Sequence, residues 1–488
     1  MRKTKIVCTL GPATDNEDVL RKLMLAGMNV ARLNFSHGTH EEQKKRMDMV
    51  KKLRAELGLP IAILLDTKGP EIRTRDFEGG KAELKAGDFF TLTTRDLVGD
   101  STITSITYKD LYKDVQIGTH ILIDDGLIEL QVTSISGEDI LCTVITGGPV
   151  SNHKGINVPD VHLNMPYLSE VDQSDILFGI EQDVDFIAAS FVRSAKDVLE
   201  IRELLNANGG NNINIISKIE NSEGVNHIDD IIYVSDGIMV ARGDMGVEIP
   251  CEEVPVIQKM IINKVYMAGK QVITATQMLD SMIKNPRPTR AETTDVANAI
   301  YDGTSAVMLS GESAAGKYPV EAVRTMAKIA AQAEKDKMEE NDIPIPLTPE
   351  NTDVTSFLAK QAVRATTLMP IRAIITDSFS GLTARNLAAF RGKYPVLAVC
   401  YNEKTMRHLA LSYGVEAIYM PEKANGQEYY FTALRKLLDD GVLSHNDMVA
   451  YLSGGKMGTR TSFLEINQVD DVLKNADDYV LPNRNRYL

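Results

Sequence analysis

Cysteine patterns that would indicate disulfides or a zinc site are missing from this chain. Its 488 residues include no tryptophan and four cysteines, Cys8, Cys142, Cys251 and Cys400, which lie far apart with no CxxC spacing. This spacing is typical of reduced thiols in a cytosolic protein. No apolar run is long enough to span a membrane, and the N-terminal MRKTKIVCTLGPA lacks the apolar core of a signal peptide. We therefore expect a cytoplasmic protein with no membrane partner.

An excess of positive charge is also missing. The chain has 67 acidic and 53 basic residues, which gives a formal net charge of −14. An acidic balance argues against nonspecific nucleic-acid binding, although a locally basic site can still hold an anionic substrate. The length exceeds what one hydrophobic core supports, so two or three domains are expected.

Common catalytic and nucleotide-binding motifs are absent as well. No GxGxxG, HExxH or GxSxG pattern occurs, and GESAAGKY (311–318) departs from a P-loop because Tyr318 stands where the motif needs Ser or Thr. We expect this segment to be a loop after a strand. Any nucleotide would bind without a Walker motif.

Alternating strand and helix patterns dominate the chain. About eight strand–helix units occur before residue 338, the number that closes a β/α barrel, whereas an open doubly wound sheet needs no eighth unit. Period-two alternation from about Gly69 to Lys154, with a turn signal at Asp125-Gly126, predicts a small all-β insertion. An acidic, Pro-rich linker precedes a further α/β region. The predicted domains are a (β/α)8 TIM barrel (1–69 and 155–338), a β-rich lid (70–154) and a C-terminal α/β domain (352–488).

Three charged residues lie at or just after the ends of two consecutive predicted strands. Lys218 and Glu220 end IISKIE, and Asp244 follows GIMVARG. The strand ends of a barrel converge on one mouth, where catalytic side chains collect. Glu220 and Asp244 are oxygen ligands suited to Mg²⁺, and Lys218 can hold a developing enolate oxygen as a point charge. The alternative is a surface pair at strand ends, worth at most about 1 kcal/mol.

Two further groups of residues are placed to bind ions. Asn34, Ser36, Asp66 and Thr67 follow the second and third predicted strands. With one formal charge among mostly oxygen donors, they suit K⁺ better than a divalent ion, although helix capping explains the same residue types. Arg32, Arg73 and Lys154 are plausible phosphate-binding cations, and the last two flank the lid; ordinary surface charge is the alternative.

The chain resembles the pyruvate kinase family over essentially its whole length. The resemblance rests on TKIVCTLGPAT, MNVARLNFSHG, LLDTKGPEIRT, KGINVP, ISKIEN, IMVARGDMGVE, TATQML and NPRPTRAETTDVANAIYDGTSAVMLSGE. It implies transfer of a phosphoryl group from phosphoenolpyruvate to ADP, giving pyruvate and ATP in the last step of glycolysis. It further implies a barrel, an inserted β lid and a C-terminal regulatory domain, assembled as a homotetramer.

The resemblance also assigns roles to individual positions. It implies that Arg32 binds phosphate, that Lys218 stabilises the transition state, and that Glu220 and Asp244 bind Mg²⁺ or Mn²⁺. It implies that K⁺ is bound by Asn34, Ser36, Asp66 and Thr67. It places on the nucleotide side Arg73, Lys154, His37 and Asn34. It implies that the pocket for the substrate carboxylate is formed by Gly243, Asp244 and Thr276. A helix beginning after Gly243 would supply N–H groups to that carboxylate. Thr276 with an ordered water would be the route for the final proton. Glu71 is the residue type associated with a need for K⁺.

The C-terminal region departs most from the family. TDSFSGLTARNLAAF resembles a phosphate loop for an effector, in which Ser378, Ser380 and Thr383 offer hydroxyls and Gly381 frees the backbone. A later loop, SGGKMGTRTSF, would close over it through Lys456 or Arg460. A sugar phosphate or nucleotide effector is one interpretation, and a plain turn between strand and helix is the other.

Two other functions fit parts of the pattern. A Mg²⁺-dependent aldolase or lyase would share the barrel, but it needs no nucleotide lid. An inactive, metabolite-sensing paralogue would show a damaged site, whereas every assigned position is intact.

Overall fold

The barrel is the central body of the molecule. The computed structural model describes residues 2–336, 353–421, 426–454 and 460–480. Eight parallel strands close in the order β1-β17-β16-β15-β14-β13-β3-β2. They are β1 (Lys5–Thr9), β2 (Val30–Asn34), β3 (Ala62–Asp66), β13 (Phe186–Ala189), β14 (Asn214–Ile219), β15 (Gly237–Ala241), β16 (Gln271–Ala275) and β17 (Ala306–Leu309). The predicted TIM barrel is confirmed, and the open doubly wound sheet is wrong because the sheet closes on itself.

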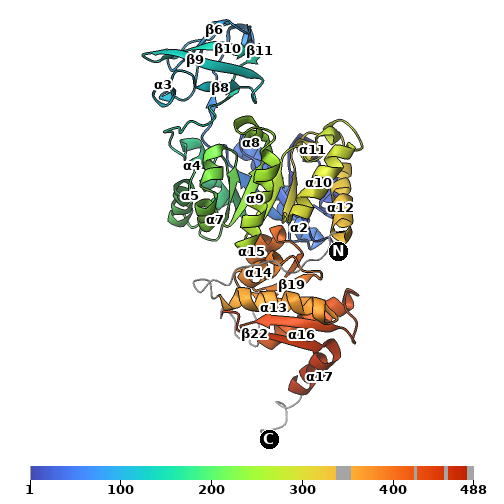
Figure 1. Cartoon of the computed structure of the whole chain (residues 1–488). Helices are drawn as coiled ribbons and strands as arrows, with labels where there is room; N and C mark the ends of the chain where they lie inside the picture. The colour runs from blue at the N-terminus through green and yellow to red at the C-terminus, as the bar shows by residue number, and fades with distance from the viewer. Residues whose placement is uncertain (1, 337–352, 422–425, 455–459, 481–488) are drawn as a thin grey trace.

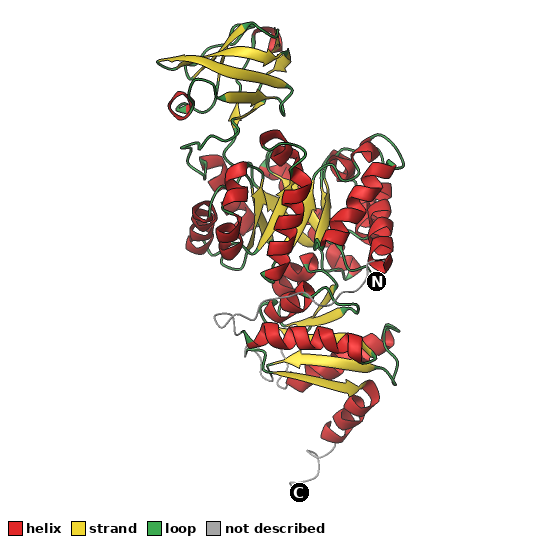
Figure 2. Cartoon of the chain, in the orientation of Figure 1, coloured by secondary structure: helices red, strands yellow, loops and turns green. Residues whose placement is uncertain are grey.

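Helices surround these strands, as Figure 2 shows. The outer ring is formed by α1 (Glu17–Ala26), α2 (His40–Leu57), α4 (Glu170–Glu181), α5 (Ala195–Ala207), α7 (Ile228–Val234), α9 (Val254–Met267), α10 (Arg290–Asp302) and α12 (Pro319–Asp336). Local sequence sets their ends: α2 begins with a capping box between Thr39 and Glu42 and ends at Gly58 with φ of 63°. Shorter helices follow strands at the mouth, namely α6 (Ser222–Asn226), α8 (Arg242–Glu248) and α11 (Gly311–Ala314). The last of these is one helical turn within the segment expected to be a loop.

The inside of the barrel is a packed apolar core, which is why its strands are apolar on both faces. Side chains from all eight strands, including Val7, Leu64 and Phe186, are fully buried in it. Ala410 and Leu411 belong to the same cluster, although they come from the C-terminal domain. They lie in the short helix η4 (Leu409–Leu411) after α15 (Glu403–His408). The C-terminal domain therefore closes the barrel floor, the end where the strands begin.

The insertion after β3 forms its own β-sheets beyond the barrel mouth (Figure 1). A seven-stranded sheet has the order β4-β12-β8-β9-β10-β6-β7, and β11 pairs with β5. The strands are β4 (Ile72–Arg73), β5 (Lys81–Leu84), β6 (Phe89–Thr93), β7 (Ile103–Ser105), β8 (His120–Ile123), β9 (Ile128–Ser136), β10 (Asp139–Thr146), β11 (Gly148–Ser151) and β12 (Gly155–Asn157), with one helical turn, α3 (Leu111–Asp114). The turn signal at Asp125-Gly126 joins the antiparallel pair β8 and β9, with positive φ at both residues. The exact domain boundaries stay a prediction.

The C-terminal domain is a five-stranded sheet between helices. Its strand order is β20-β19-β18-β21-β22, with β22 antiparallel to β21. The strands are β18 (Ile371–Ser378), β19 (Val396–Cys400), β20 (Val415–Tyr419), β21 (Met448–Ser453) and β22 (Phe463–Gln468), and the longer helices are α13 (Val354–Leu368), α14 (Leu382–Ala389), α16 (Gly426–Asp439) and α17 (Val469–Val480). Across the part of the chain that the structure describes, no helix has the length and apolar character needed to cross a membrane.

Candidate active site

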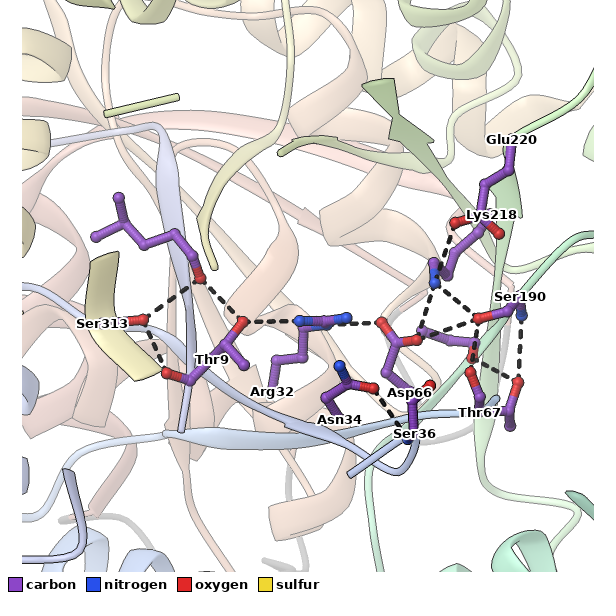
Figure 3. Close-up of polar contacts among 12 residues, drawn as sticks. Thr9, Arg32, Asn34, Ser36, Asp66, Thr67, Ser190, Lys218, Glu220 and Ser313 are labelled. Atoms are coloured by element: carbon purple, nitrogen blue, oxygen red, sulfur yellow. Dashed lines mark hydrogen bonds and ion pairs between the residues drawn. The ribbon is translucent and has the colours of Figure 1, made fainter. Parts of the chain in front are cut away.

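A row of alternating charges crosses the barrel mouth, as Figure 3 shows. Arg32 Nε donates to Asp66 Oδ2 at 2.6 Å, and Lys218 Nζ donates to Asp66 Oδ1 at 3.0 Å. Lys218 Nζ also lies 3.2 Å from Glu220 Oε1. All four residues are at most 8% exposed. One buried carboxylate therefore holds an arginine and a lysine side by side.

Strand register explains why these residues meet. Asn34 pairs with Asp66 between β2 and β3, and Ala188 pairs with Asp66 between β13 and β3. Lys218 lies near the end of β14 and Glu220 directly follows it. Because all eight strands are parallel, their final residues meet at the same end of the barrel. The sequence prediction that Lys218, Glu220, Asp66 and Arg32 share one mouth therefore agrees with these positions.

The central ion pairs keep their charges despite burial. Burial by itself would raise the pKa of Asp66, but Arg32 and Lys218 outweigh it and hold that pKa below its usual value. Burial would lower the pKa of Lys218, but Asp66 and Glu220 raise it above its ordinary value. Lys218 is therefore a permanent ammonium, suited to hydrogen bonding and charge stabilisation rather than to taking up a proton.

Glu220 differs from Asp66 because its negative charge is poorly compensated. Burial, together with the nearby charge of Asp244, raises the pKa of Glu220 to about 7, although Lys218 opposes the shift. Glu220 Oε2 accepts from the backbone N–H of Phe191 at 2.6 Å, whereas Oε1 is buried without a hydrogen bond despite the nearby ammonium. A bound cation would satisfy this oxygen and restore the carboxylate, so Glu220 and Asp244 fit a divalent metal.

The protein alone supplies few metal ligands. No group of three or more His, Cys, Asp or Glu side chains that could hold a metal occurs among the described residues. Magnesium usually keeps several waters and shares oxygens with its substrate, so two carboxylates suffice for this ion.

The predicted monovalent ligands also lie together. Asn34 and Asp66 are register partners, Asn34 Oδ1 accepts from Ser36 N at 3.1 Å, and Ser190 Oγ donates to Thr67 O at 2.6 Å. The set offers oxygen atoms with one formal charge, which suits a monovalent cation. The Ser36 contact is also ordinary turn geometry, so the alternative of turn chemistry accounts for part of the arrangement.

The loops after β15 and β16 pack tightly against each other. A Cβ at Gly243 would come 2.7 Å from Thr276 Cγ2, so this close approach requires glycine. Thr276 and Gln277 have φ of 73° and 54°, which strains non-glycine residues. Arg242 holds the strained loop through Thr276 O at 2.7 Å and pairs with Asp295 at 2.8 Å. Helix α8 begins at Arg242, one residue before Gly243 rather than after it.

The predicted nucleotide-side cations lie on the lid. Arg73 on β4 is the register partner of Gly155 on β12, which brings it beside Lys154. Arg73 Nη2 lies 2.6 Å from Glu71 Oε2, and Lys154 Nζ lies 2.8 Å from Asp124 Oδ1. His37 is exposed, in the turn after β2.

The lid touches the barrel next to the metal-binding residues. Asn157 Nδ2 donates to Glu248 Oε1 at 3.0 Å, which ties β12 to α8. A Cβ at Gly126 in the β8–β9 turn would come 3.7 Å from Val247 Cγ1 of α8, so this turn faces the barrel mouth. Burial and the charge of Asp244 raise the pKa of the adjacent Asp125. A cavity of about 340 Å³ lies behind this junction, lined by Pro70, Val158 and Leu163 of the lid connections and by Phe191 and Asn221 of the barrel. It adjoins Glu220 but contains neither Arg32 nor Lys218.

Two residues of the site were missed by sequence reasoning. Thr9 Oγ1 accepts from Arg32 Nη1 at 2.9 Å, and Ser190 Oγ accepts from Lys218 Nζ at 2.7 Å. Both stand at the ends of barrel strands, which was the available signal, but a lone hydroxyl there is too common to single out.

The predicted effector loop is a turn between β18 and α14. Ser378 Oγ accepts from Gly381 N at 2.9 Å, and Gly381 has φ of 81°. Thr383 Oγ1 lies 2.8 Å from Thr461 Oγ1, which joins the two predicted loops, and Ser380 O accepts from Arg385. Arg460 is exposed, and Lys456 lies outside the described residues. These contacts fit both interpretations of the loop.

Together, the closed barrel, the β lid and the buried cations at the mouth define the chain as a β/α-barrel enzyme for an anionic substrate. Family models for the pyruvate kinase barrel domain and the pyruvate kinase alpha/beta domain match residues 1–323 and 357–467. The chain therefore belongs to the pyruvate kinase family. It is a phosphotransferase that converts phosphoenolpyruvate and ADP to pyruvate and ATP.

Individual pyruvate kinases are similar to this chain over nearly its full length. A pyruvate kinase of Clostridium acetobutylicum is 50% identical over 473 residues, covering 96% of this chain and 100% of the relative. One of Geobacillus stearothermophilus is 50% identical over 477 residues, covering 97% of this chain and 81% of the relative. The crystal structure of a pyruvate kinase from Cryptosporidium parvum superposes with a TM-score of 0.90 at 38% identity and covers 96% of both chains. The aldolase and lyase alternative is thereby excluded.

Proposed function

We propose that phosphoryl transfer takes place at the barrel mouth, with Arg32 on the transferred phosphate and Lys218 on the enolate oxygen. The observation that carries this assignment is the shared carboxylate: Asp66 holds Arg32 through one oxygen and Lys218 through the other. The two cations are thereby held rigidly beside each other. Phosphoryl transfer depends mainly on such alignment and charge neutralisation.

We further propose that Glu220 and Asp244 hold Mg²⁺ or Mn²⁺, and that Asn34, Ser36, Asp66 and Thr67 hold K⁺. When bound, the divalent ion polarises phosphoryl and enolate oxygens. The orphaned Glu220 Oε1 and its raised pKa support the first assignment. The register pairing of Asn34 with Asp66 supports the second.

The chain's residues have separate tasks in the reaction. A terminal oxygen of the ADP β-phosphate attacks phosphorus, and the bond from phosphorus to the enol oxygen breaks. Lys218 donates a hydrogen bond to the oxygen that gains negative charge, and Arg32 holds the moving phosphoryl group. Arg73, Lys154, His37 and Asn34 bind the nucleotide side as the lid closes. The enolate of pyruvate then takes a proton on its methylene carbon, by way of Thr276 and an ordered water, while Gly243 and Asp244 border the substrate carboxylate.

A coupled assay tests the two cation assignments separately. ATP formation from phosphoenolpyruvate and ADP should require both Mg²⁺ and K⁺. Glu71→Lys should retain activity when K⁺ is omitted, because the new side chain adds a positive charge in the segment that directly follows the predicted K⁺ ligands Asp66 and Thr67. Glu78→Lys makes the same charge change at an exposed lid position and should keep the K⁺ requirement. If Glu71→Lys still depends fully on K⁺, the monovalent assignment is wrong.

We propose in addition that the chain assembles as a homotetramer and that the loop 378–383 binds a phosphorylated effector. The coupling of its Thr383 to Thr461 of the second loop supports the effector site. Sedimentation measures the assembly, and titration of activity with sugar phosphates and AMP tests the effector. A flat response to every compound would leave the loop as a plain turn.

A further inference from the structure

Ser190 is the residue in which contacts from several parts of the site converge. It directly follows β13 and is 1% exposed. Its backbone N–H donates to Thr67 Oγ1 at 3.2 Å, and its carbonyl accepts from the Tyr167 hydroxyl at 2.9 Å. Both main-chain polar groups are therefore fixed, so the side chain leaves the backbone at a fixed place.

The Ser190 hydroxyl is fixed in direction as well. It has one hydrogen to donate, and Thr67 O lies nearer, at 2.6 Å, than Asp66 Oδ1, at 3.2 Å. With that hydrogen directed to Thr67 O, the oxygen lone pairs face Lys218 Nζ at 2.7 Å. Ser190 is thus an oriented acceptor for the lysine.

This acceptor settles how the ammonium uses its three hydrogens. One goes to Ser190 and one to Asp66 Oδ1, whereas Glu220 Oε1 receives no hydrogen bond although it lies 3.2 Å away. The third hydrogen remains for the substrate oxygen. Without Ser190, the flexible lysine stem would let the ammonium turn toward the carboxylates of Asp66 and Glu220.

The same short segment positions Glu220. Phe191, the next residue, has φ of 53° and donates its N–H to Glu220 Oε2 at 2.6 Å. Gly69, at the start of the lid connection, packs so closely that a Cβ there would come 2.8 Å from Ser190 Cβ. Any shift of Ser190 is therefore resisted from both sides.

We propose that Ser190 is a positioning residue for the phosphoryl transfer, holding the Lys218 ammonium so that one of its N–H groups points at the reacting oxygen. The proposal rests on the role assigned to Lys218 above. Because a hydrogen bond to a charged group is lost, Ser190→Ala should lower kcat about 10- to 100-fold. The KM for phosphoenolpyruvate should change less than about threefold, because Arg32 still binds the phosphate.

Matched variants separate this role from a structural one. Ser235→Ala removes a buried hydroxyl at the opposite end of the barrel, where it contacts Ser217, and should leave kcat unchanged. Ser190→Cys nearly keeps the size of the side chain but offers a weak acceptor, so it should resemble Ser190→Ala. A Ser190→Ala defect that vanishes at high K⁺ would place the residue in the cation site through Thr67 and overturn the proposal.

A double-mutant cycle with Lys218→Ala completes the test. If Ser190 acts through Lys218, Ser190→Ala should lower the residual activity of Lys218→Ala less than about twofold. Equal losses in both backgrounds would overturn the inference while leaving Lys218 in its role. If Lys218→Ala itself remains active, the proposed function of Lys218 fails instead, so the two failures are distinguishable.

Discussion

At the mouth of the barrel, the buried carboxylate of Glu220 is left short of partners, whereas at its floor the buried carboxylate of Asp185 is satisfied. Glu220 Oε1 at the mouth has no hydrogen bond, and the neighbouring backbone is strained at Phe191 and Thr276. At the floor, Asp185 accepts from Arg407 Nε at 2.7 Å and from Ile63 N at 2.8 Å. The same residue types thus serve binding where partners are lacking and serve domain attachment where they are complete.

The largest expected effect is a loss of turnover when a charged residue at the mouth is replaced. Lys218→Ala should lower kcat by about 10³-fold or more, because the developing negative charge loses its fixed donor. Mg²⁺ binding, measured by calorimetry, should persist because Glu220 and Asp244 remain. Lys264→Ala removes a half-buried lysine that pairs with the exposed Asp229 away from the mouth, and it serves as the control. Near-normal turnover in Lys218→Ala would contradict the assigned role.

At the floor, we expect a replacement to lower the stability of the protein rather than its turnover. Asp185→Ala should cost about 3–5 kcal/mol of stability, because it removes the buried carboxylate beside Arg407 and leaves that buried charge facing the exposed carboxylates of Asp183 and Glu403. Turnover of the remaining folded enzyme should stay close to normal. Scanning calorimetry of the full chain measures the shift.

Asp183→Ala provides a matched control for the floor. Asp183 contacts the same cations, Lys404 and Arg407, but its side chain is 60% exposed, so its loss should cost about 1 kcal/mol or less. Equal losses of thermal stability for the two variants would show that burial of the carboxylate does not determine how much its ion pair stabilises the floor.

A smaller, pH-dependent effect is expected from His408, which is also at the floor. Burial lowers the pKa of His408 to about 4 from 6.5, and the charged groups around it are Asp185, Lys404, Arg385 and Asp236. The unfolded chain binds this proton more readily, so the stability that the neutral ring contributes is present above pH 6.5 and is lost as pH falls through 4. The full difference is about 3 kcal/mol.

Comparison of two proteins isolates that contribution. His408→Gln should show a shallower loss of thermal stability between pH 6.5 and 4 than the parent chain. The subtraction removes other groups that titrate in this range, including Glu220. Identical pH profiles would exclude His408 as a source of acid sensitivity.

The sequence allowed the barrel to be predicted because its signals are local. Strand and helix patterns alternate, and Lys218 and Glu220 stand two residues apart at a strand end, so their common direction followed from strand geometry. The lid turn at Asp125-Gly126 could likewise be predicted, because its signal is a pair of adjacent residues.

Features that depend on distant partners could not be predicted in this way. Ser190 acquires its importance from Lys218 and Thr67, which lie on other strands, and nothing in DFIAASF distinguishes it from any serine after a strand. The segment NSEGVNHIDDIIYV forms two helices, α6 and α7, and the boundary between them is at His227, whose ring contacts Arg193 O at 3.0 Å. Leu411 is an ordinary apolar residue in sequence, and only the tertiary structure places it inside the barrel.

The position of Leu411 has a consequence for how the chain can be divided. Leu411 of the C-terminal domain fills part of the inside of the barrel domain. The barrel domain therefore cannot be excised at the linker without exposing the apolar residues of its floor to water. A displacement of α15 would likewise be transmitted directly to the lowest layer of barrel side chains, beginning with Phe186, whose ring lies 5.5 Å from that of His408.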